Sequence, residues 1–284
     1  MKRIIFIFGV VLTLILAGCS TDSDTCAHDW SAWAVKVEPG YCVGATHSDD
    51  GEAARACATC SETEKRTICG GTEGLAITDG EVTGIGTAGA VTHLCIPDFD
   101  PDTGEPVKSI GEWAFVNNIV LVSVRAGLNL TVIDYLQAFS GCTNLSDASF
   151  PAVTIIDEGA FGLCASLKEI SFPEVTFIGD GAFWNCTSLE EVSFPKATSI
   201  DDWAFQDCTN LSDASFPAVT SIGEGAFQNC TSLKEVTLGA ITEANFNTHV
   251  DTVPGDLRDK YFTPGGGKGT YISDLATPPV WTKQ

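Results

Sequence analysis

A 22-residue period runs through the second half of the chain and constrains its fold more than any other feature. Phenylalanine recurs at this interval, each time preceded by alanine, at Phe139, Phe161, Phe183, Phe205 and Phe227. Cysteine keeps the same interval at Cys142, Cys164, Cys186, Cys208 and Cys230. One such unit is too short to enclose a core, whereas three or more stacked units can. The sequence therefore predicts a solenoid, with repeats over residues 113–240 that include a degenerate first copy.

The pattern within one unit predicts how the chain folds. Over residues 167–172, apolar and polar residues alternate, which is typical of a strand with one buried face. Pro173 lacks an amide donor and ends this strand. A Gly-Asp-Gly turn at 179–181 is then followed by a short helical or 3-10 turn that places Phe183 in the core. Neighbouring units are expected to stack about 4.8 Å apart.

The repeat matches the leucine-rich-repeat signature L-x-x-L-x-L and more narrowly resembles the BspA-like bacterial family, whose units read roughly I-G-x-x-A-F-x-x-C-x-x-L-x-x-I-x-L-P. The pattern is filled by Ile178-Gly179, Ala182-Phe183, Cys186, Leu189, Val192 and Phe194-Pro195. The resemblance covers about residues 75–240. It implies an α/β leucine-rich-repeat solenoid that is mostly β, in a surface protein with an adhesive role. Phenylalanine before the proline departs from the family pattern and is expected to change only the core volume.

The repeat cysteines are predicted to be free thiols. Neighbouring cysteines of a stacked column could approach disulfide distance. There are five of them, however, so pairing would leave one over. Small, apolar, buried side chains are the expected role of such a column.

Outward positions of the predicted strands form two columns. If the apolar residues of the strand face inward, Glu169 and Ser171 face outward. The equivalent acids are Asp147, Glu169, Glu191, Asp213 and Glu235, and the equivalent hydroxyls are Ser149, Ser171, Ser193, Ser215 and Thr237. Like charges side by side across strands are destabilising. Two interpretations stay open: a ribbon that binds a basic protein or calcium, or a solvated surface copied with each repeat that prevents aggregation.

Three tryptophans occupy variable positions beside the core phenylalanines. They are Trp113, Trp184 and Trp203. Tryptophan is enriched at interaction hot spots, which makes them candidates for partner contacts. Packing against an adjacent turn is the alternative.

The first 18 residues are predicted to be a secretory signal. Two basic residues precede an apolar run over residues 4–16, an order typical of such signals. The run is shorter than the roughly 20 residues of a spanning helix. Residues 16–19 resemble the lipobox of bacterial lipoproteins, which implies cleavage before Cys19 and its lipidation. Ser20 follows, so display on the outer membrane or cell surface is expected, with residues 19–24 as a tether.

Residues 25–72 lack the period and are predicted to form a small cysteine-rich module. Cys26, His28, Cys57 and Cys60 form a C-x-H … C-x-x-C set that suits tetrahedral zinc. With two nearby tryptophans, the segment resembles a short module of bacterial secreted repeat proteins. The alternative is a disulfide-stapled segment outside the cytoplasm, in which Cys95 could supply a partner. Four protein ligands would leave no open position, so a structural role is expected.

The flanks of the repeats are predicted to be caps, at residues 75–112 and 241–284. Terminal repeat units are expected to be atypical because one face meets water. A short helix is predicted from 254–256 through Tyr261. The open end is expected to be covered by Tyr261, Phe262, Tyr271 and Trp281.

Charge and motif content narrow the function. The net charge of −22 argues against nucleic-acid binding. The chain has no P-loop, G-x-S-x-G or H-E-x-x-H motif, and the regular repeats contain no histidine, so an enzyme is not expected. The prediction is a monomeric surface lipoprotein that reaches the membrane through its lipid anchor and binds a protein, basic or of extracellular-matrix type. The alternative is an envelope scaffold or a metal-binding lipoprotein.

Overall fold

The computed structural model describes residues 72–133, 136–246, 254–274 and 279–284 in full, together with three strands of the N-terminal segment. These strands are β1 (Ala34–Val37), β2 (Gly51–Ala56) and β3 (Thr63–Ile68). They form a sheet in the order β1-β2-β3, with β1 antiparallel to β2. Residues 1–37 and 52–67 make up one compact unit, and the remainder of the chain makes up a second.

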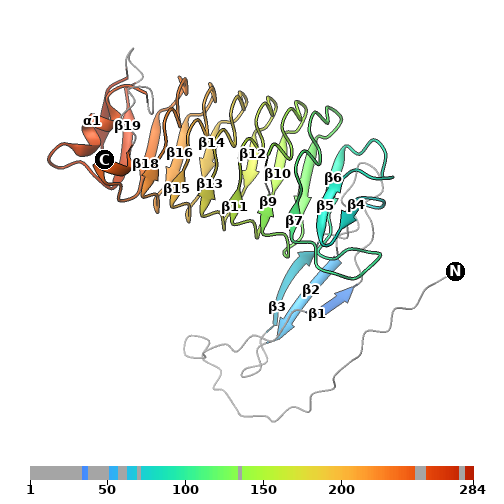
Figure 1. Ribbon diagram of the computed structural model, residues 1–284. Coiled ribbons are helices and arrows are strands. Elements are labelled where there is room, and N and C mark those ends of the chain that lie inside the picture. Colours follow the sequence, from blue (N-terminus) through green and yellow to red (C-terminus); the bar gives the residue numbers. More distant parts are fainter. Residues whose placement is uncertain are drawn as a thin grey trace, which may run out of the picture. The chain divides into compact units, whose positions relative to one another are not determined.

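The second unit is a solenoid in which each coil adds one strand to a first row of parallel strands, here called row A (Figure 1). Row A consists of β6 (His93–Ile96), β8 (Ser123–Ala126), β10 (Asp147–Ser149), β12 (Glu169–Ser171), β14 (Glu191–Ser193), β16 (Asp213–Phe216) and β18 (Glu235–Leu238). Equivalent residues of neighbouring repeats are paired, for example Asp147 with Glu169. This row is the predicted strand, and Pro173 follows it as expected.

A second row of short parallel strands, row B, was not predicted. It contains β5 (Glu81–Gly84), β7 (Ser109–Ile110), β9 (Val132–Ile133), β11 (Ile155–Ile156), β13 (Phe177–Ile178), β15 (Ser199–Ile200) and β17 (Ser221–Ile222). An antiparallel strand, β4 (Ala76–Thr78), begins this eight-stranded sheet. Two-residue strands are too short to display an alternating pattern, although each full repeat buries an isoleucine here, such as Ile178.

The third side of each coil, the turn side, is built from tight turns that are linked to the next coil. The amides of Gly181, Phe183 and Asn185 donate hydrogen bonds of 2.8–2.9 Å to carbonyls of the following coil. Between them, the amide of Trp184 closes a turn on the carbonyl of Gly181. Gly181 and Asn185 have positive φ. The predicted short turn that delivers Phe183 to the core is thus a pair of turns that also extends the inter-coil ladder.

Two columns of stacked phenylalanines fill the core. In the first, Phe115 and the five repeat phenylalanines stack with ring centroids 5.0–5.4 Å apart. In the second, Phe150, Phe172, Phe194 and Phe216 stack at 5.3–6.0 Å. Rings of one column meet rings of the other in tilted or edge-to-face contacts, for example Phe161 and Phe172 at 5.6 Å. Such geometries favour aromatic pairs beyond the area they bury.

The repeat cysteines form a third buried column and are free thiols, which confirms the prediction. Each thiol donates to the carbonyl of a phenylalanine in the preceding coil; for Cys186 and Phe161 the Sγ–O distance is 3.1 Å. The thiols therefore satisfy backbone carbonyls while packing as small apolar groups.

Row A is interrupted between β12 and β14, which are not paired, so it divides into two sheets. Here Ile170 and Val192 are neighbours on the inward face. In every other pair of neighbouring full repeats, one of these two residues is Ala148 or Ala214. Two large β-branched side chains side by side account for the missing pairing, because the core has no small partner there to interdigitate with.

The C-terminal cap closes the solenoid with aromatic residues. Strand β18 pairs with β19 (Gly269–Ser273), which pairs with β20 (Trp281–Lys283). A 3-10 turn, η1 (Glu243–Asn245), and the predicted helix, α1 (Leu257–Phe262), complete it. Tyr261, Tyr271 and Trp281 are buried as expected, whereas Phe262 is only partly buried. Among the described residues, no helix has the length and apolarity needed to cross a membrane.

Candidate binding surfaces of the solenoid

The predicted acidic residues form an outward column on row A, here called the acidic column (Asp147, Glu169, Glu191, Asp213 and Glu235). Asp147 is paired with Glu169, and Asp213 lies between Glu191 and Glu235 in register. The three glutamates are exposed and the two aspartates half-buried. Because β12 and β14 are not paired, the structure brings the acids together as a pair and a triplet.

The predicted hydroxyl column lies beside these acids in the same register. Ser171 pairs with Ser149, and Ser215 lies between Ser193 and Thr237. At the C-terminal end, Thr237 Oγ1 lies 2.8 Å from Thr270 Oγ1 of β19, so the cap covers this end. Lysines occupy the position before the acid in two coils, at Lys168 and Lys234. The acidic column is therefore a mixed surface in those coils and purely acidic beside Glu191.

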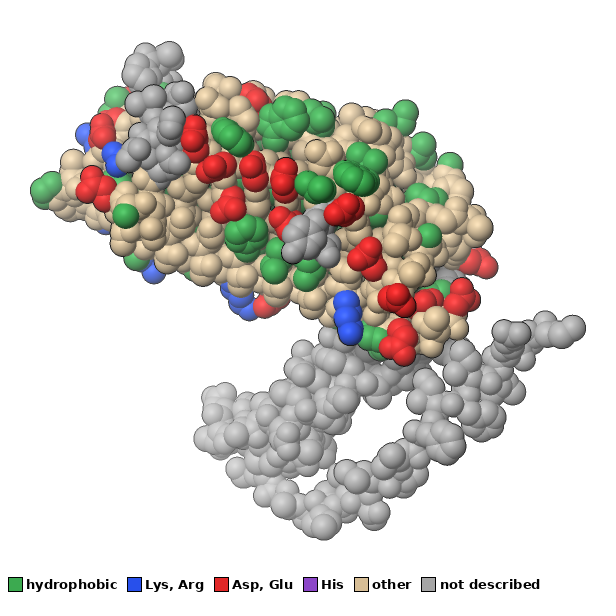
Figure 2. All heavy atoms as spheres, viewed as in Figure 1, with side chains coloured by type: hydrophobic (Ala, Val, Ile, Leu, Met, Phe, Trp, Pro, Cys, Tyr) green, Lys and Arg blue, Asp and Glu red, His purple; other side chains and the backbone are tan. Residues whose placement is uncertain are grey.

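A second line of acids, missed in the sequence, follows the corner between row B and the turn side. This corner column consists of Glu158, Asp180, Asp202 and Glu224, again 22 residues apart. Burial raises the pKa of the Asp180 carboxyl, and repulsion from Glu158, Asp202 and Asp201 adds to the rise. The same register that revealed the acidic column could have found it. Figure 2 shows acidic side chains along the length of the visible face and few basic ones.

A shallow groove of about 190 Å³ opens beside the corner column. Its lining residues are Gln137, Glu158, Gly159, Asp180, Gly181, Trp184, Trp203 and Gln206. Trp184 and Trp203 are 40% and 39% exposed. A Cβ atom on Gly225 would lie 2.5 Å from Trp203 Cδ1, so this indole covers the glycine of the next coil. Trp203 thus packs against an adjacent turn, as one of the two interpretations predicts, and both rings are partly exposed to solvent. A role of these tryptophans in partner contacts stays a prediction.

Comparison with models of known protein families shows which family the chain belongs to. A model of the BspA-type leucine-rich-repeat region, in six copies, matches residues 101–211 and 135–250. The chain belongs to this family. Its predicted resemblance and solenoid fold are confirmed. Leucine-rich-repeat proteins generally bind other proteins and are typically non-catalytic.

Solved structures similar to this BspA-type chain come from several bacteria. A leucine-rich-repeat protein from Bacteroides ovatus is 31% identical over 51% of this chain and 37% of its own, with a TM-score of 0.46. The chain thus spans little more than a third of that protein. A leucine-rich-repeat protein of T. pallidum is 25% identical, covering 56% of this chain and 86% of its own, with a TM-score of 0.44. A leucine-rich cell surface protein of Faecalibacterium prausnitzii is 17% identical over 61% and 83%, with a TM-score of 0.21. The search of curated proteins gave no match.

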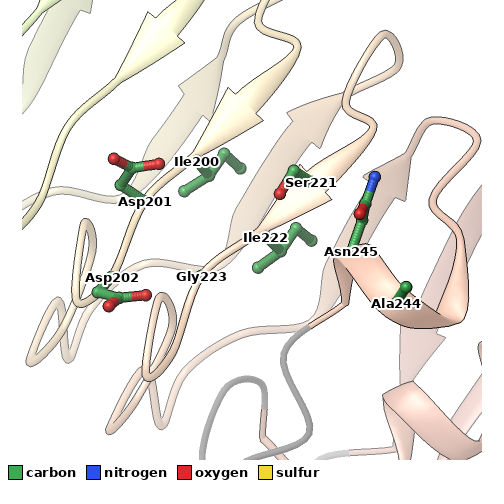
Figure 3. A pocket seen from close by; sticks show the side chains of 8 residues that line it. All are labelled: Ile200, Asp201, Asp202, Ser221, Ile222, Gly223, Ala244 and Asn245. Carbon is green, nitrogen blue, oxygen red and sulfur yellow. The ribbon is translucent and has the colours of Figure 1, made fainter.

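Another pocket of the BspA-type solenoid, of about 280 Å³, lies where row B ends (Figure 3). Asp201 and Asp202 line it from the coil of β15, and Asn245 of η1 faces it from the cap. Burial raises the pKa of Asp201, while a hydrogen bond from Ser199 opposes the rise. Within residues 72–284 as far as they are described, no three His, Cys, Asp or Glu side chains are placed to hold a metal ion. The pocket therefore has acidic character without a ligand set.

The thiols of this BspA-type chain are poor nucleophiles. Burial raises the pKa of Cys142 and of Cys208 to about 12. It also raises the pKa of the other three well above the ordinary value. A nucleophilic cysteine needs the opposite shift, because only the thiolate reacts.

Several predicted site residues lie outside the described part of the chain. These are the lipidation site Cys19 and the zinc ligands Cys26, His28, Cys57 and Cys60. They stay predictions. Cys95, which is described, is disulfide-bonded, and its partner is none of the five repeat cysteines because those are free.

Proposed function

We propose that this protein is an exported, lipid-anchored surface protein whose solenoid binds a protein partner through the acidic column. The observation that carries the proposal is the register of row A, which sets outward carboxylates on successive coils. Such a surface attracts basic groups, and the net charge of −22 would speed their approach at low salt. A basic protein, or one of extracellular-matrix type, is therefore the proposed partner.

Export is supported by two features of different origin. The N-terminal order of charge, apolar run and Cys19 is that of a lipoprotein signal. In addition, Cys95 takes part in a disulfide, and disulfides persist mainly in oxidising compartments outside the cytoplasm. We place the protein, as a monomer, on the outer membrane or the cell surface. Replacing Cys19 with serine should abolish partition into the detergent phase, and retained partition would contradict the lipid anchor.

The binding proposal is tested with residues 20–284 in soluble form. Purified matrix proteins and bacterial surface proteins are screened by biolayer interferometry, and each partner found is compared with a variant of the acidic column. That variant carries Glu169→Gln, Glu191→Gln and Asp213→Asn. Exposed charges contribute about 0.5 kcal/mol each, so binding should weaken roughly tenfold, mainly through a slower association rate.

A matched control separates the acidic column from overall charge. Asp102, Glu105 and Asp259 are exposed acids outside row A, and replacing them with amides changes the net charge by the same amount. This control should bind as the parent protein does. Equal weakening in both variants would mean that only net charge matters, and no weakening in either would move the interface elsewhere. If the protein binds none of the screened proteins and deletion of its gene impairs only envelope integrity, the protein is an envelope scaffold.

A further inference from the structure

Trp203 occupies a backbone position that the neighbouring coils fill with glycine. Its φ is 52°, compared with 61° for Gly159, 56° for Gly181 and 59° for Gly225. The amides of Gly159, Gly181 and Trp203 each donate to the carbonyl of the residue before the equivalent position of the next coil. This left-handed conformation is costly for a bulky side chain. Trp203 nevertheless holds a large aromatic ring at this position, partly in solvent.

The glycines on the preceding coils leave a floor of bare backbone beside this ring. A Cβ atom on Gly159 would lie 3.0 Å from Gln137 Cγ, and one on Gly181 would lie 3.7 Å from Trp184 Cβ. Gln137 and Trp203 are three coils apart, so the floor between them is about 14 Å long at the usual strand spacing. The groove therefore exists because two successive coils carry glycine while the coils on either side carry large side chains.

The walls of the groove combine flat aromatic rings with carboxylates. Trp184 flanks the floor and donates through Nε1 to Asp207 Oδ2 at 3.4 Å, which orients its ring. Glu158 and Asp180 line the groove from the corner column. None of the eight lining residues is basic. An occupant with a positive charge and a planar apolar face would complement both features.

We propose that the groove between Trp184 and Trp203 receives an arginine side chain of a protein partner. A guanidinium group stacks on indole rings and donates a fork of hydrogen bonds to carboxylates. The volume of about 190 Å³ is below that of pockets for drug-sized molecules, which start at about 300 Å³, and suits one side chain. The groove lies on the turn side and not on row A, so this contact does not depend on the acidic column.

The repulsion within the corner column favours the same occupant. Burial and the neighbouring carboxylates Glu158, Asp202 and Asp201 raise the pKa of Asp180. A bound cation would relieve this repulsion and hold the carboxyl ionised. A neutral sugar could also stack on tryptophan, but it would leave the negative charges uncompensated. We therefore assign the groove to a cation.

The test measures binding of a short peptide by the full soluble chain. The probe is the acetylated peptide Gly-Arg-Gly-Arg-Gly amide, titrated by NMR on its arginine Cδ protons. A peptide with citrulline for arginine keeps the shape and loses the charge. We expect saturable binding of the arginine peptide that is at least tenfold tighter than binding of the citrulline peptide. Equal binding of the two peptides, or tighter binding of a neutral oligosaccharide such as maltopentaose, would overturn the proposal.

Two variants with the same substitution locate the site. Trp203→Gly restores the residue of the neighbouring coils, so the variant should fold, and it should weaken arginine-peptide binding at least tenfold. Trp113→Gly removes a tryptophan with the same φ of 52° that does not line the groove, and it should leave binding unchanged. Unchanged binding in Trp203→Gly would refute the groove. The acidic-column variant should still bind the peptide; if that variant alone loses binding, row A is the arginine site and only the proposed function survives.

Discussion

Removing one ring from the phenylalanine stack should cost more in the middle of the solenoid than at its beginning. Phe183 meets four other rings, at 5.4 Å (Phe161), 6.1 Å (Phe172), 5.9 Å (Phe194) and 5.3 Å (Phe205). Phe115 has one ring neighbour in the stack, at 5.0 Å. Both side chains are buried. The two positions therefore share the loss of apolar burial and differ in three aromatic contacts.

The expected magnitudes follow from these contacts. A buried Phe→Ala change costs about 3–5 kcal/mol, and each aromatic pair adds about 0.5–1.5 kcal/mol beyond burial. Phe183→Ala should thus lower the free energy of unfolding by about 2–4 kcal/mol more than Phe115→Ala. In a solenoid each coil contacts only its neighbours, so the central substitution should also weaken the coupling between the two halves.

Urea unfolding followed by circular dichroism measures both effects. We expect a lower midpoint for Phe183→Ala and a smaller slope or a second transition, because the N-terminal and C-terminal coils then unfold separately. Phe183→Leu, which refills most of the volume, is the control and should keep a single transition. Equal destabilisation by Phe183→Ala and Phe115→Ala would refute the idea that ring contacts along the stack carry the difference.

Three further outcomes are expected. Each buried thiol holds its proton more tightly in the folded state than at the ordinary pKa of 9.0. Its stabilising contribution is therefore complete below pH 9 and is lost as the pH rises toward 12, at up to about 1.4 kcal/mol per pH unit for each thiol. Cys186→Ala should reduce the slope of stability against pH by about a fifth between pH 9 and 10, below the range in which Tyr271 contributes, and an unchanged slope would contradict this. Val192→Ala places a small residue beside Ile170 and should let β12 and β14 pair. The pairing would appear as slower amide hydrogen exchange over residues 190–194. Faster exchange would show that the lost packing of Val192 destabilises the strand more than any new pairing stabilises it. The mature protein purified under reducing conditions should contain one zinc ion per chain, lost on replacing Cys57 and Cys60 with serine, and a metal-free parent protein would disprove the proposed site.

The sequence alone predicted those features that one repeat shares with the next. Once Ile170 and Phe172 were placed inward, the 22-residue period fixed the outward positions, the stack of phenylalanines and the column of thiols. Row B was beyond this reasoning because its strands after β5 have two residues each, as at Ser199–Ile200. The interruption of row A depends on two inward residues being large in consecutive coils, which is a property of neighbours and not of one repeat.

The groove was missed for a related physical reason. Its floor and its walls come from four coils, and it exists only because Gly159 and Gly181 are followed by Trp203 at the same position. The signal was present in the sequence as tryptophan in a register where glycine is common. Interpreting it required the backbone conformation, because only the positive φ shows why glycine adopts this position with less strain than other residues.

Residues that recur in every coil and residues that differ between coils are different kinds of evidence for a binding site. Inward residues must recur because each coil packs against the next, and outward residues can recur merely because a whole unit was copied. The uniform acids of row A can have either origin, and comparing the acidic-column variant with its matched control separates a binding surface from a copied one. Trp203 cannot be explained by copying, since the neighbouring full repeats carry glycine, and it keeps an unfavourable backbone conformation. If Trp203→Gly raises stability and abolishes arginine binding while the acidic-column variant does neither, the binding specificity of this solenoid resides where its coils differ.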